Sequence, residues 1–254
     1  MARSLTFNGT DLSAHGLTVL RSPRVWTPPT VARSRIVPFS DKAYSTPNYY
    51  GPRSISLDVF VEGTSPSNCR TKLDAIAAVL NSREDAALIL DVWPGRYWMA
   101  RLSGQSRFIQ EGQIAKGAIE FRADDPHAFS TTETVDTETL PSALGFTQVA
   151  GGTADAYPVW MIEATGGATT VVLENETTSE RVAWVGNVPA GEWLRFDADP
   201  ANWLASTSND GSDWTVAMSG VSGEFPRLVP GNNAIAITGV SNGELTITFR
   251  DRYV

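Results

Sequence analysis

The stretch S-P-S-N-C-R-T-K-L-D-A-I-A-A-V-L-N, residues 65–81, decides the fold, because it is the one convincing helix in a sequence otherwise patterned as strands and turns. Ser65 can cap this helix, and Pro66 suits its first position. Apolar residues recur at helical spacing along one side, at Leu73, Ile76, Ala77 and Leu80. A single apolar stripe needs a partner surface, so we predict that the helix covers a sheet built from the strands around it.

Strands are predicted on both sides of this helix. Residues 54–61 alternate between polar and apolar side chains and lead directly into the helix. Beyond it, residues 86–92 form a buried strand, and residues 96–104 return as the second strand of a hairpin. Residues 115–124 alternate again, which predicts a strand with one face in water. Together these elements assign residues 1–130 to one N-terminal, β-sandwich-like domain.

The segment 21–53 has a different composition, because its many prolines alternate with arginines and aromatic residues. Proline cannot donate to a sheet ladder, so the segment is predicted to form an extended arm or a long edge hairpin. Its aromatic side chains would be poorly used in a loop that touched only water, which favours contact with a neighbour. The candidate contact residues are Trp26, Arg33, Arg35, Phe39, Tyr44 and Tyr49.

The C-terminal part of the chain contains strand patterns only. From Pro158 onward, short alternating segments are separated by turns that contain glycine, proline or asparagine. Strands at this spacing indicate a β-sandwich. We therefore predict a mainly β protein with a connecting segment at 131–153 and a second domain at 154–254.

The net charge of −8 is unevenly distributed along the chain. Residues 1–126 hold 15 Lys and Arg and 12 Asp and Glu, a balance of +3, whereas residues 127–254 hold 5 and 16, a balance of −11. The acidic half is not suited to contact with a nucleic-acid backbone or an anionic membrane. The same charge could also serve only to keep a β domain soluble.

The sequence offers few residues for catalysis or metal binding. It contains two histidines, His15 and His127, and one cysteine, Cys69, without a metal-ligand or nucleophile motif. We expect no enzymatic activity, no cofactor and no metal site. Two carboxylate pairs leave a hydrolase as an alternative, and these are Asp124 with Asp125 and Asp197 with Asp199. Each pair ends a strand before a proline, where Asp commonly bonds its own backbone.

Exposed tryptophans are the better candidates for a site. Trp160, Trp184 and Trp193 lie within alternating strands and are expected in the core. Trp203 and Trp214 lie beside loops rich in Asp and Asn. They could stack on sugar rings, with Asp210 and Asp213 beside Trp214 as polar contacts. This favours, as an alternative function, a carbohydrate-binding protein that recognises a host surface glycan.

No run of apolar residues reaches the length of a signal peptide at the N-terminus or of a bilayer span elsewhere. The single cysteine allows no intrachain disulfide. We expect a soluble protein that is made in a cytoplasm and does not insert into membranes.

Several motifs follow one another in order along the chain. In the first domain they are F-N-G-T-D-L-S-A-H-G-L-T-V, I-S-L-D-V-F-V-E-G, K-L-D-A-I-A-A-V-L, W-P-G-R-Y-W-M-A-R-L-S-G and A-I-E-F-R-A-D-D-P-H-A-F. In the second they are G-T-A-D-A-Y-P-V-W-M-I-E-A, F-P-R-L-V-P-G-N-N-A-I-A-I and F-R-D-R-Y-V. In order and spacing these motifs resemble the distal tail proteins of long-tailed, non-contractile bacteriophages. The chain departs from that family at residues 37–45, V-P-F-S-D-K-A-Y-S, where a tight turn with glycine is usual.

The resemblance implies a structural hub of the virion tail tip, made in the host cytoplasm. Six copies would close into a ring through the N-terminal domains. One face would dock the tail tube protein and the other the tail-tip hub or tail-associated protein, and DNA would only pass through the lumen. The C-terminal domain would be a galectin-like or carbohydrate-module-like sandwich that projects outward and carries a receptor-binding protein.

Overall fold

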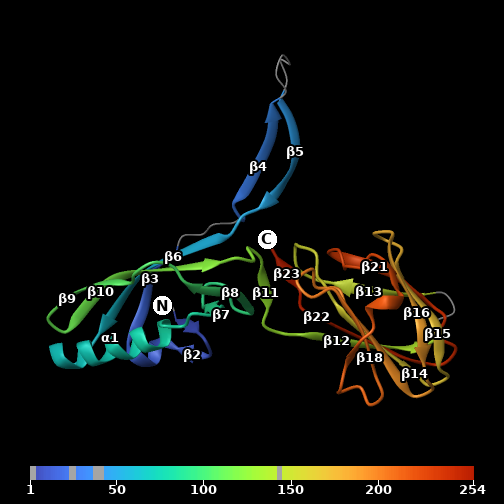
Figure 1. The fold of residues 1–254 in the computed structure, drawn as a ribbon. Coiled ribbons are helices and arrows are strands. Elements are labelled where there is room, and N and C mark those ends of the chain that lie inside the picture. Colours follow the sequence, from blue (N-terminus) through green and yellow to red (C-terminus); the bar gives the residue numbers. More distant parts are fainter. Residues whose placement is uncertain (1–3, 23–26, 37–42, 142–144) are drawn as a thin grey trace. The chain divides into compact units, whose positions relative to one another are not determined.

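The computed structural model describes residues 4–22, 27–36, 43–141 and 145–254. For residues 32–36 and 43–48 it describes the backbone alone. The chain divides into two compact units, residues 1–129 with Val254 and residues 130–253. Most described residues in regular structure lie in antiparallel strands (Figure 1). The predicted mainly β class is therefore confirmed.

The first unit is built on one large antiparallel sheet. Its strands lie in the order β2-β1-β7-β8-β10-β6-β3, β9 pairs with β10, and β11 pairs with β8. Their bounds are β1 Leu5–Phe7, β2 Thr10–Asp11, β3 Leu17–Arg21, β6 Arg53–Glu62, β7 Ala86–Leu90, β8 Arg96–Leu102, β9 Arg107–Glu111, β10 Ile114–Ala123 and β11 Ala128–Ser130. A short 3-10 helix, Leu12–His15, joins β2 to β3.

The core of this unit follows from the alternation in β6. Every second residue of this strand, from Arg53 to Val61, is buried, and the residues between them point away from the core. Strand β10 pairs with β6 along its whole length, from Ile114 opposite Glu62 to Ala123 opposite Arg53. The long register fixes which face of both strands is buried.

Helix α1, Pro66–Leu80, confirms the predicted helix. The Ser65 hydroxyl accepts a hydrogen bond from the Asn68 backbone N–H at 3.1 Å, so the cap forms as predicted. The buried side is formed by Cys69, Ile76 and Leu80, with Leu73 half-buried. Ala77 is exposed, because the buried line runs along positions 69, 73, 76 and 80 and leaves position 77 to one side.

Gly63 lets α1 approach the end of β6 closely. A Cβ at this position would lie 2.5 Å from the backbone nitrogen of Cys69. Real Cβ atoms do not come this close to another backbone atom. Glycine is therefore the residue that fits between the end of the strand and the first turn of the helix.

The predicted arm is a hairpin of β4, Thr30–Ile36, and β5, Ala43–Tyr50 (Figure 1). These two strands pair with each other and form a separate two-stranded sheet. The connecting residues 37–42, part of the segment where the sequence departs from the family that it resembles, lie outside the described residues. The arm leaves the first unit between β3 and β6.

The second unit is a β-sandwich, as predicted. One sheet has the order β12-β22-β14-β17-β18-β19 and the other the order β13-β21-β15-β16-β20. The first comprises Thr134–Leu140, Gly243–Phe249, Val159–Ala164, Glu192–Asp197, Leu204–Ser208 and Thr215–Val216, and the second Phe146–Ala150, Gly231–Thr238, Ala168–Asn175, Glu180–Val188 and Val221–Gly223. A 3-10 helix lies at Met218–Gly220, and β23 is Arg252–Tyr253. Inward-facing side chains of both sheets, among them Trp160 and Trp184, form one hydrophobic cluster.

The segment 131–153, predicted as a connection, contains two strands of this sandwich. Strand β12 pairs with β22 from Thr134 to Leu140, and β13 pairs with β21 from Phe146 to Ala150. Each ends the strand order of its sheet. In β12 only Leu140 is buried, so backbone pairing rather than an apolar pattern holds this strand in place.

Candidate functional site

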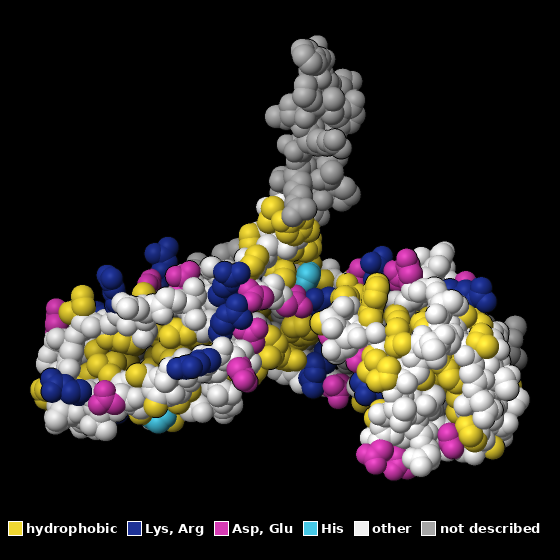
Figure 2. Space-filling model, in the orientation of Figure 1, with side chains coloured by type: hydrophobic (Ala, Val, Ile, Leu, Met, Phe, Trp, Pro, Cys, Tyr) yellow, Lys and Arg dark blue, Asp and Glu magenta, His cyan; other side chains and the backbone are white. Residues whose placement is uncertain are grey.

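The base of the arm exposes aromatic side chains. Tyr49 is 45% exposed and Tyr50 is 46% exposed. The Tyr50 ring meets the His127 ring edge to face, with centroids 5.5 Å apart, and His127 Nδ1 lies 2.9 Å from Asp125 Oδ1. Figure 2 shows hydrophobic side chains around the lower part of the arm. This region is suited to contact with another protein.

The predicted arm residues are described to different degrees. Trp26 and Phe39 lie outside the described residues. Arg33 and Arg35 lie on β4 and Tyr44 on β5, where Arg35 pairs with Tyr44, but only their backbone is described. Tyr49 is the one member whose side chain is described, and it is exposed.

A cleft opens where the arm joins β6. It has a volume of about 490 Å³ and is lined by Thr27, Pro28, Pro29, Thr30, Pro52, Arg53 and Ser54. Gly51 N donates a 2.7 Å hydrogen bond to Pro29 O, which closes the base of the hairpin. Sequence reasoning placed Arg53 at the end of the arm and missed that its side chain is buried. Its burial could have been predicted from its place two residues before Ile55, because alternate residues of β6 lie on the same face.

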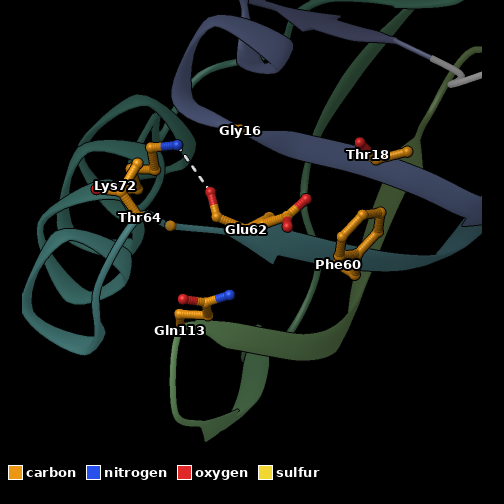
Figure 3. A pocket seen from close by; sticks show the side chains of 8 residues that line it. Gly16, Thr18, Phe60, Glu62, Thr64, Lys72 and Gln113 are labelled. Atoms are coloured by element: carbon orange, nitrogen blue, oxygen red, sulfur yellow. Dashed lines mark hydrogen bonds between the residues drawn. The ribbon is translucent and has the colours of Figure 1, made fainter.

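A second, open pocket of about 630 Å³ lies between β3, the end of β6 and α1 (Figure 3). Lys72 Nζ donates to Glu62 O at 2.7 Å and thereby ties the helix to the strand. Gly16 has a φ of +76°, and a Cβ there would lie 2.8 Å from Glu62 O.

The carboxylates of the first candidate pair, Asp124 and Asp125, have different partners. Asp124 binds Arg101 and Arg122, and Asp125 binds His127. The hydrogen bond from Arg122, with the contribution of Arg101, holds the pKa of Asp124 below its ordinary value. Asp124 is thus held by two arginines, while Asp125 contacts the histidine two positions later.

The second pair, Asp197 and Asp199, fixes the backbone after β17. Asp197 accepts hydrogen bonds from Arg195 Nη2 at 3.2 Å and from Asp199 N at 3.1 Å. The Asp199 carboxylate in turn accepts from Ala201 N at 3.0 Å. Both carboxylates thus terminate a strand, as the sequence indicated.

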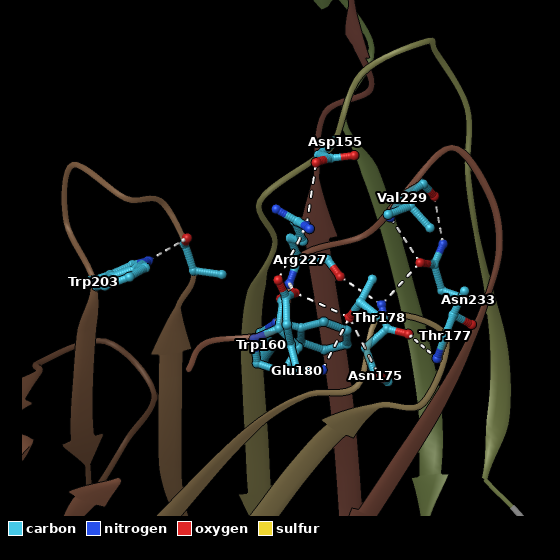
Figure 4. Close-up of polar contacts among 12 residues, drawn as sticks. Asp155, Trp160, Asn175, Thr177, Thr178, Glu180, Trp203, Arg227, Val229 and Asn233 are labelled. Carbon is cyan, nitrogen blue, oxygen red and sulfur yellow. Dashed lines mark hydrogen bonds and ion pairs between the residues drawn. The ribbon is translucent and has the colours of Figure 1, made fainter. Parts of the chain in front are cut away.

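Trp203 is held as an exposed aromatic platform. Its side chain is 50% exposed, its Nε1–H donates to Ala198 O at 3.2 Å, and its ring lies 6.2 Å from that of Phe225 (Figure 4). Its φ of 26° lies in the region that L-residues rarely adopt. Surrounding contacts therefore fix the direction of the indole.

Trp214 lies away from Trp203. The two residues flank opposite ends of β18, Leu204–Ser208. A strand rises about 3.3 Å per residue, so the length of β18 holds the two residues apart. Trp214 is half-buried, and Arg195 Cζ lies 5.7 Å from its ring centroid. The structure does not bring the two candidate tryptophans into one stacking face. Trp193, expected in the core, is also half-buried.

Asp210 organises the turn before Trp214. Its Oδ1 accepts hydrogen bonds from Ser212 N at 2.9 Å, from Asp213 N at 3.1 Å and from Ser208 Oγ at 3.0 Å. The backbone bonds from Ser212 and Asp213 are the main cause of a pKa far below the ordinary value for Asp210. Asp213 is exposed in the same turn.

A buried polar network in the second unit was not predicted (Figure 4). Asn175 and Asn233 are both 0% exposed. Asn175 Nδ2 donates to Arg227 O at 2.7 Å, and Asn233 Nδ2 donates to Val229 O at 2.8 Å. Glu180 accepts from Arg227 N at 3.0 Å. This network anchors the segment F-P-R-L-V-P, residues 225–230, to the sandwich. The sequence feature that could have predicted this network is the presence of two asparagines, Asn175 and Asn233, at inward-facing strand positions.

No helix among the described residues is long and apolar enough to cross a lipid bilayer. Groups of three or more potential metal ligands are likewise absent from the described part of the chain.

Comparisons with known proteins cover both units. Residues 11–123 match the family model of the phage tail protein RIFT-related domain, and residues 151–253 match that of the siphovirus-type tail component, C-terminal domain. The crystal structure of the Dit protein of phage SPP1 has a similar fold, with 16% identity, a TM-score of 0.81 and 100% coverage of both chains. A chain of the phage p2 baseplate in its activated conformation with Sr is similar at 8% identity, a TM-score of 0.51 and 98% coverage of both chains. No curated protein sequence matches the chain.

Both family models describe components of the phage tail rather than enzymes, in agreement with the prediction of a non-catalytic virion protein. The two models together span most of the chain in the predicted order. The chain therefore belongs to the distal tail protein family of siphophages.

Proposed function

We propose that this protein is the hub of a siphophage tail tip, in which copies assemble into a ring through their first units. The observation that carries the proposal is the arm, whose two strands pair with each other and not with the sheets of either unit in the described part of the chain. The fold supports it, because SPP1 Dit is described as a paradigm of the hub adsorption apparatus in phages that infect Gram-positive bacteria.

An isolated two-stranded hairpin is only marginally stable in water. The described base of the arm also exposes Tyr49 and Tyr50, whose large rings gain most from burial. Contact with a neighbouring copy would stabilise the hairpin and bury both tyrosine rings. The arm of one chain would contact a surface of the next chain that is not an arm. Such contacts join two different surfaces, so they run head to tail and can close into a ring.

The ring is proposed to contain six copies. One face would bind the tail tube protein and the other the tail-tip hub or tail-associated protein. The slightly basic balance of residues 1–126 is compatible with a lumen through which DNA passes, since a strongly acidic lumen would repel it. The acidic second unit would lie outside this path and carry a receptor-binding protein.

The test compares the full chain with a variant in which residues 30–50 are replaced by a short Gly-Ser linker. We expect negative-stain images of the full chain to show rings with a central channel, at six times the mass of one chain. The variant is expected to remain monomeric while both units still unfold cooperatively on heating. Monomers of the full chain at micromolar concentrations, or unchanged rings without the arm, would contradict the proposal.

A second candidate function is glycan binding by the second unit through Trp203. The observation that favours it is an exposed indole whose direction is fixed by Ala198 and Phe225. Since Trp214 lies at the other end of β18, a glycan array should show binding that is lost in Trp203→Ala and retained in Trp214→Ala. An array without signal for the wild-type chain would exclude this function for the glycans tested.

A further inference from the structure

One side of the second unit ends in two long, open sheet edges. Strands β12 and β13 are the last strands of their sheets, and within the described part of the chain each pairs on one side only. Their registers with β22 and β21 run without a shift over seven and five residues. On the opposite side the last strands are β19 and β20, with only two and three residues. Short edge strands resist pairing with another chain and long regular ones permit it, so the β12 and β13 side is the one available for pairing.

A groove of about 310 Å³ lies between these two edges. Its lining includes Ile247 of the core, the half-buried ring of Phe146, and Val149, which is 58% exposed. Gln148 Nε2 on β13 donates a 2.7 Å hydrogen bond to Asp136 Oδ2 on β12 and so joins the two strands. The groove offers backbone groups along its edges and apolar surface between them. This combination binds extended peptides by strand addition.

Two carboxylates of β12 line this groove. Asp136 and Glu138 lie on the same face of the strand as Leu140, which belongs to the core. Among the described residues neither carboxylate forms an ion pair. Asp136 bonds only the amide of Gln148, and Glu138 has no hydrogen-bond partner there. The inward face of the open edge is therefore negative.

The arginines of the second unit are engaged elsewhere. Residues 127–254 contain no lysine and five arginines, which are Arg181, Arg195, Arg227, Arg250 and Arg252. The first four form ion pairs with carboxylates outside the groove, and the Nη1 of the fifth donates to Asp155 O at 3.2 Å. A cation that pairs with Asp136 and Glu138 would therefore come from outside this unit.

The same two carboxylates disfavour a second copy of β12 as the occupant of the edge. Two β12 strands paired edge to edge would bring like charges together, which is destabilising. A strand with arginine or lysine opposite Asp136 and Glu138 gains ion pairs instead. On the other face of β12, Val135 is 56% exposed and favours a β-branched or aromatic neighbour.

We propose that the free edge of β12 receives an extended strand of another protein, in which basic residues alternate with β-branched or aromatic ones. The basic side chains would point into the groove, toward Asp136 and Glu138. The residues between them would lie beside Val135 and Thr137 on the outer face of the sheet. The proposal rests on the proposed role of the second unit as the carrier of another protein, and not on the ring.

The test measures how the full chain binds a synthetic peptide of seven residues, the length of β12, in which arginine and valine alternate. The groove variant carries Asp136→Asn and Glu138→Gln, which keep the shape of both side chains and remove their charges. The control variant carries Asp213→Asn and Glu224→Gln, because these exposed carboxylates lie next to β19 and β20 on the opposite side. Both variants lose the same charge. We expect the Kd from fluorescence anisotropy to rise about tenfold in the groove variant, which loses two cross-strand charge pairs, and to change little in the control.

Three results would overturn the proposal. The first is no binding of the peptide by the wild-type chain. The second is an equal loss of binding in both variants, which would show only a general attraction between an acidic protein and a basic peptide. The third is equal binding of a peptide that has the same composition but holds its arginines and valines in separate blocks, because strand pairing depends on the alternation.

Exchange of the charges gives a positive result to look for. In a chain with Asp136→Lys and Glu138→Lys, a peptide with glutamate in place of arginine should bind more tightly than the arginine peptide. If the arginine peptide still binds more tightly, its side chains do not lie opposite these two positions and the proposal is wrong.

Hydrogen exchange identifies the edge that the peptide uses. We expect the amides of residues 134–140 to exchange more slowly in the complex, and those of residues 215–223 to be unchanged. Protection of residues 134–140 that rises with protein concentration without peptide would identify a second copy as the occupant and overturn the proposal. Normal rings in a chain that does not bind the peptide would overturn this site and leave the ring, whereas binding by a chain that forms no rings would overturn the ring and leave this site.

Discussion

Asn175 Nδ2 donates a 3.0 Å hydrogen bond to Asn233 Oδ1, although the two residues lie 58 positions apart in the sequence. Both side chains are fully buried, and Asn233 Oδ1 also accepts from Val229 N at 2.9 Å. The pair joins β15 to β21 at the point where the segment 225–230 crosses. It therefore connects strand pairing with the conformation of a loop.

Asn233→Ala is expected to destabilise the second unit by about 2–4 kcal/mol, since it leaves several buried groups without partners. The measurement is equilibrium unfolding in urea. Asn232→Ala is the control, because the neighbouring side chain is exposed. Equal effects of the two substitutions would show that the network is not a determinant of stability.

Gly63→Ala should destabilise the first unit by at least about 2 kcal/mol. The added Cβ would lie 2.5 Å from Cys69 N, and neither the end of β6 nor the first turn of α1 can move away without loss of packing. Thr64→Ala, at the exposed next position, should have little effect. Thermal unfolding of both variants tests this, and a melting temperature of Gly63→Ala equal to wild type would contradict it.

The charge on Asp210 should make the 208–214 turn sensitive to acid. Its pKa is lowered in the folded chain, so its contribution to stability is complete above the ordinary value of 3.8 and is lost as the pH falls toward the folded-state pKa. Asp210→Asn keeps the Oδ1 acceptor but not the charge. We expect the difference in melting temperature between wild type and Asp210→Asn to be present at pH 7 and to shrink below pH 3. A difference independent of pH would assign the effect to shape rather than charge.

Tyr49→Ser should weaken ring assembly by about tenfold without a change in the melting temperature of the monomer. Exposed tyrosines in the centre of an interface often contribute more than 1 kcal/mol to binding. Val149→Ser is the control, because Val149 is also an exposed apolar side chain, at 58%, and lies on the second unit. Mass photometry at several concentrations measures both. An effect of the control as large as that of Tyr49→Ser would place the contact elsewhere.

Local signals predicted the parts of the fold that depend on local interactions. The cap at Ser65 and the proline after it fixed the start of α1, and the alternation in β6 fixed its buried face. Strand β12 escaped prediction because its residues are polar and its place depends on backbone pairing with β22, more than 100 positions later. Such pairing leaves no pattern in the strand itself.

The sequence could not predict which candidate site residues lie close together in space. Trp203 and Trp214 are close in sequence, but an intervening strand holds them apart. Arg53 was included in the arm segment 21–53 by composition, while the alternation of β6 places its side chain in the core. At this position the residue type favours exposure and the strand pattern favours burial, and the side chain is buried.

The separate sheet of the arm has a consequence for how a ring would form. In the proposed ring each chain would give one arm and receive one, so every open assembly, whatever its length, would leave one arm and one receiving surface unused. The chain that closes the ring makes two contacts at once, whereas every earlier chain makes one. Assembly of the proposed ring would then be all-or-none: partial arcs should be scarce at equilibrium, and a single defective arm should prevent closure of the whole ring.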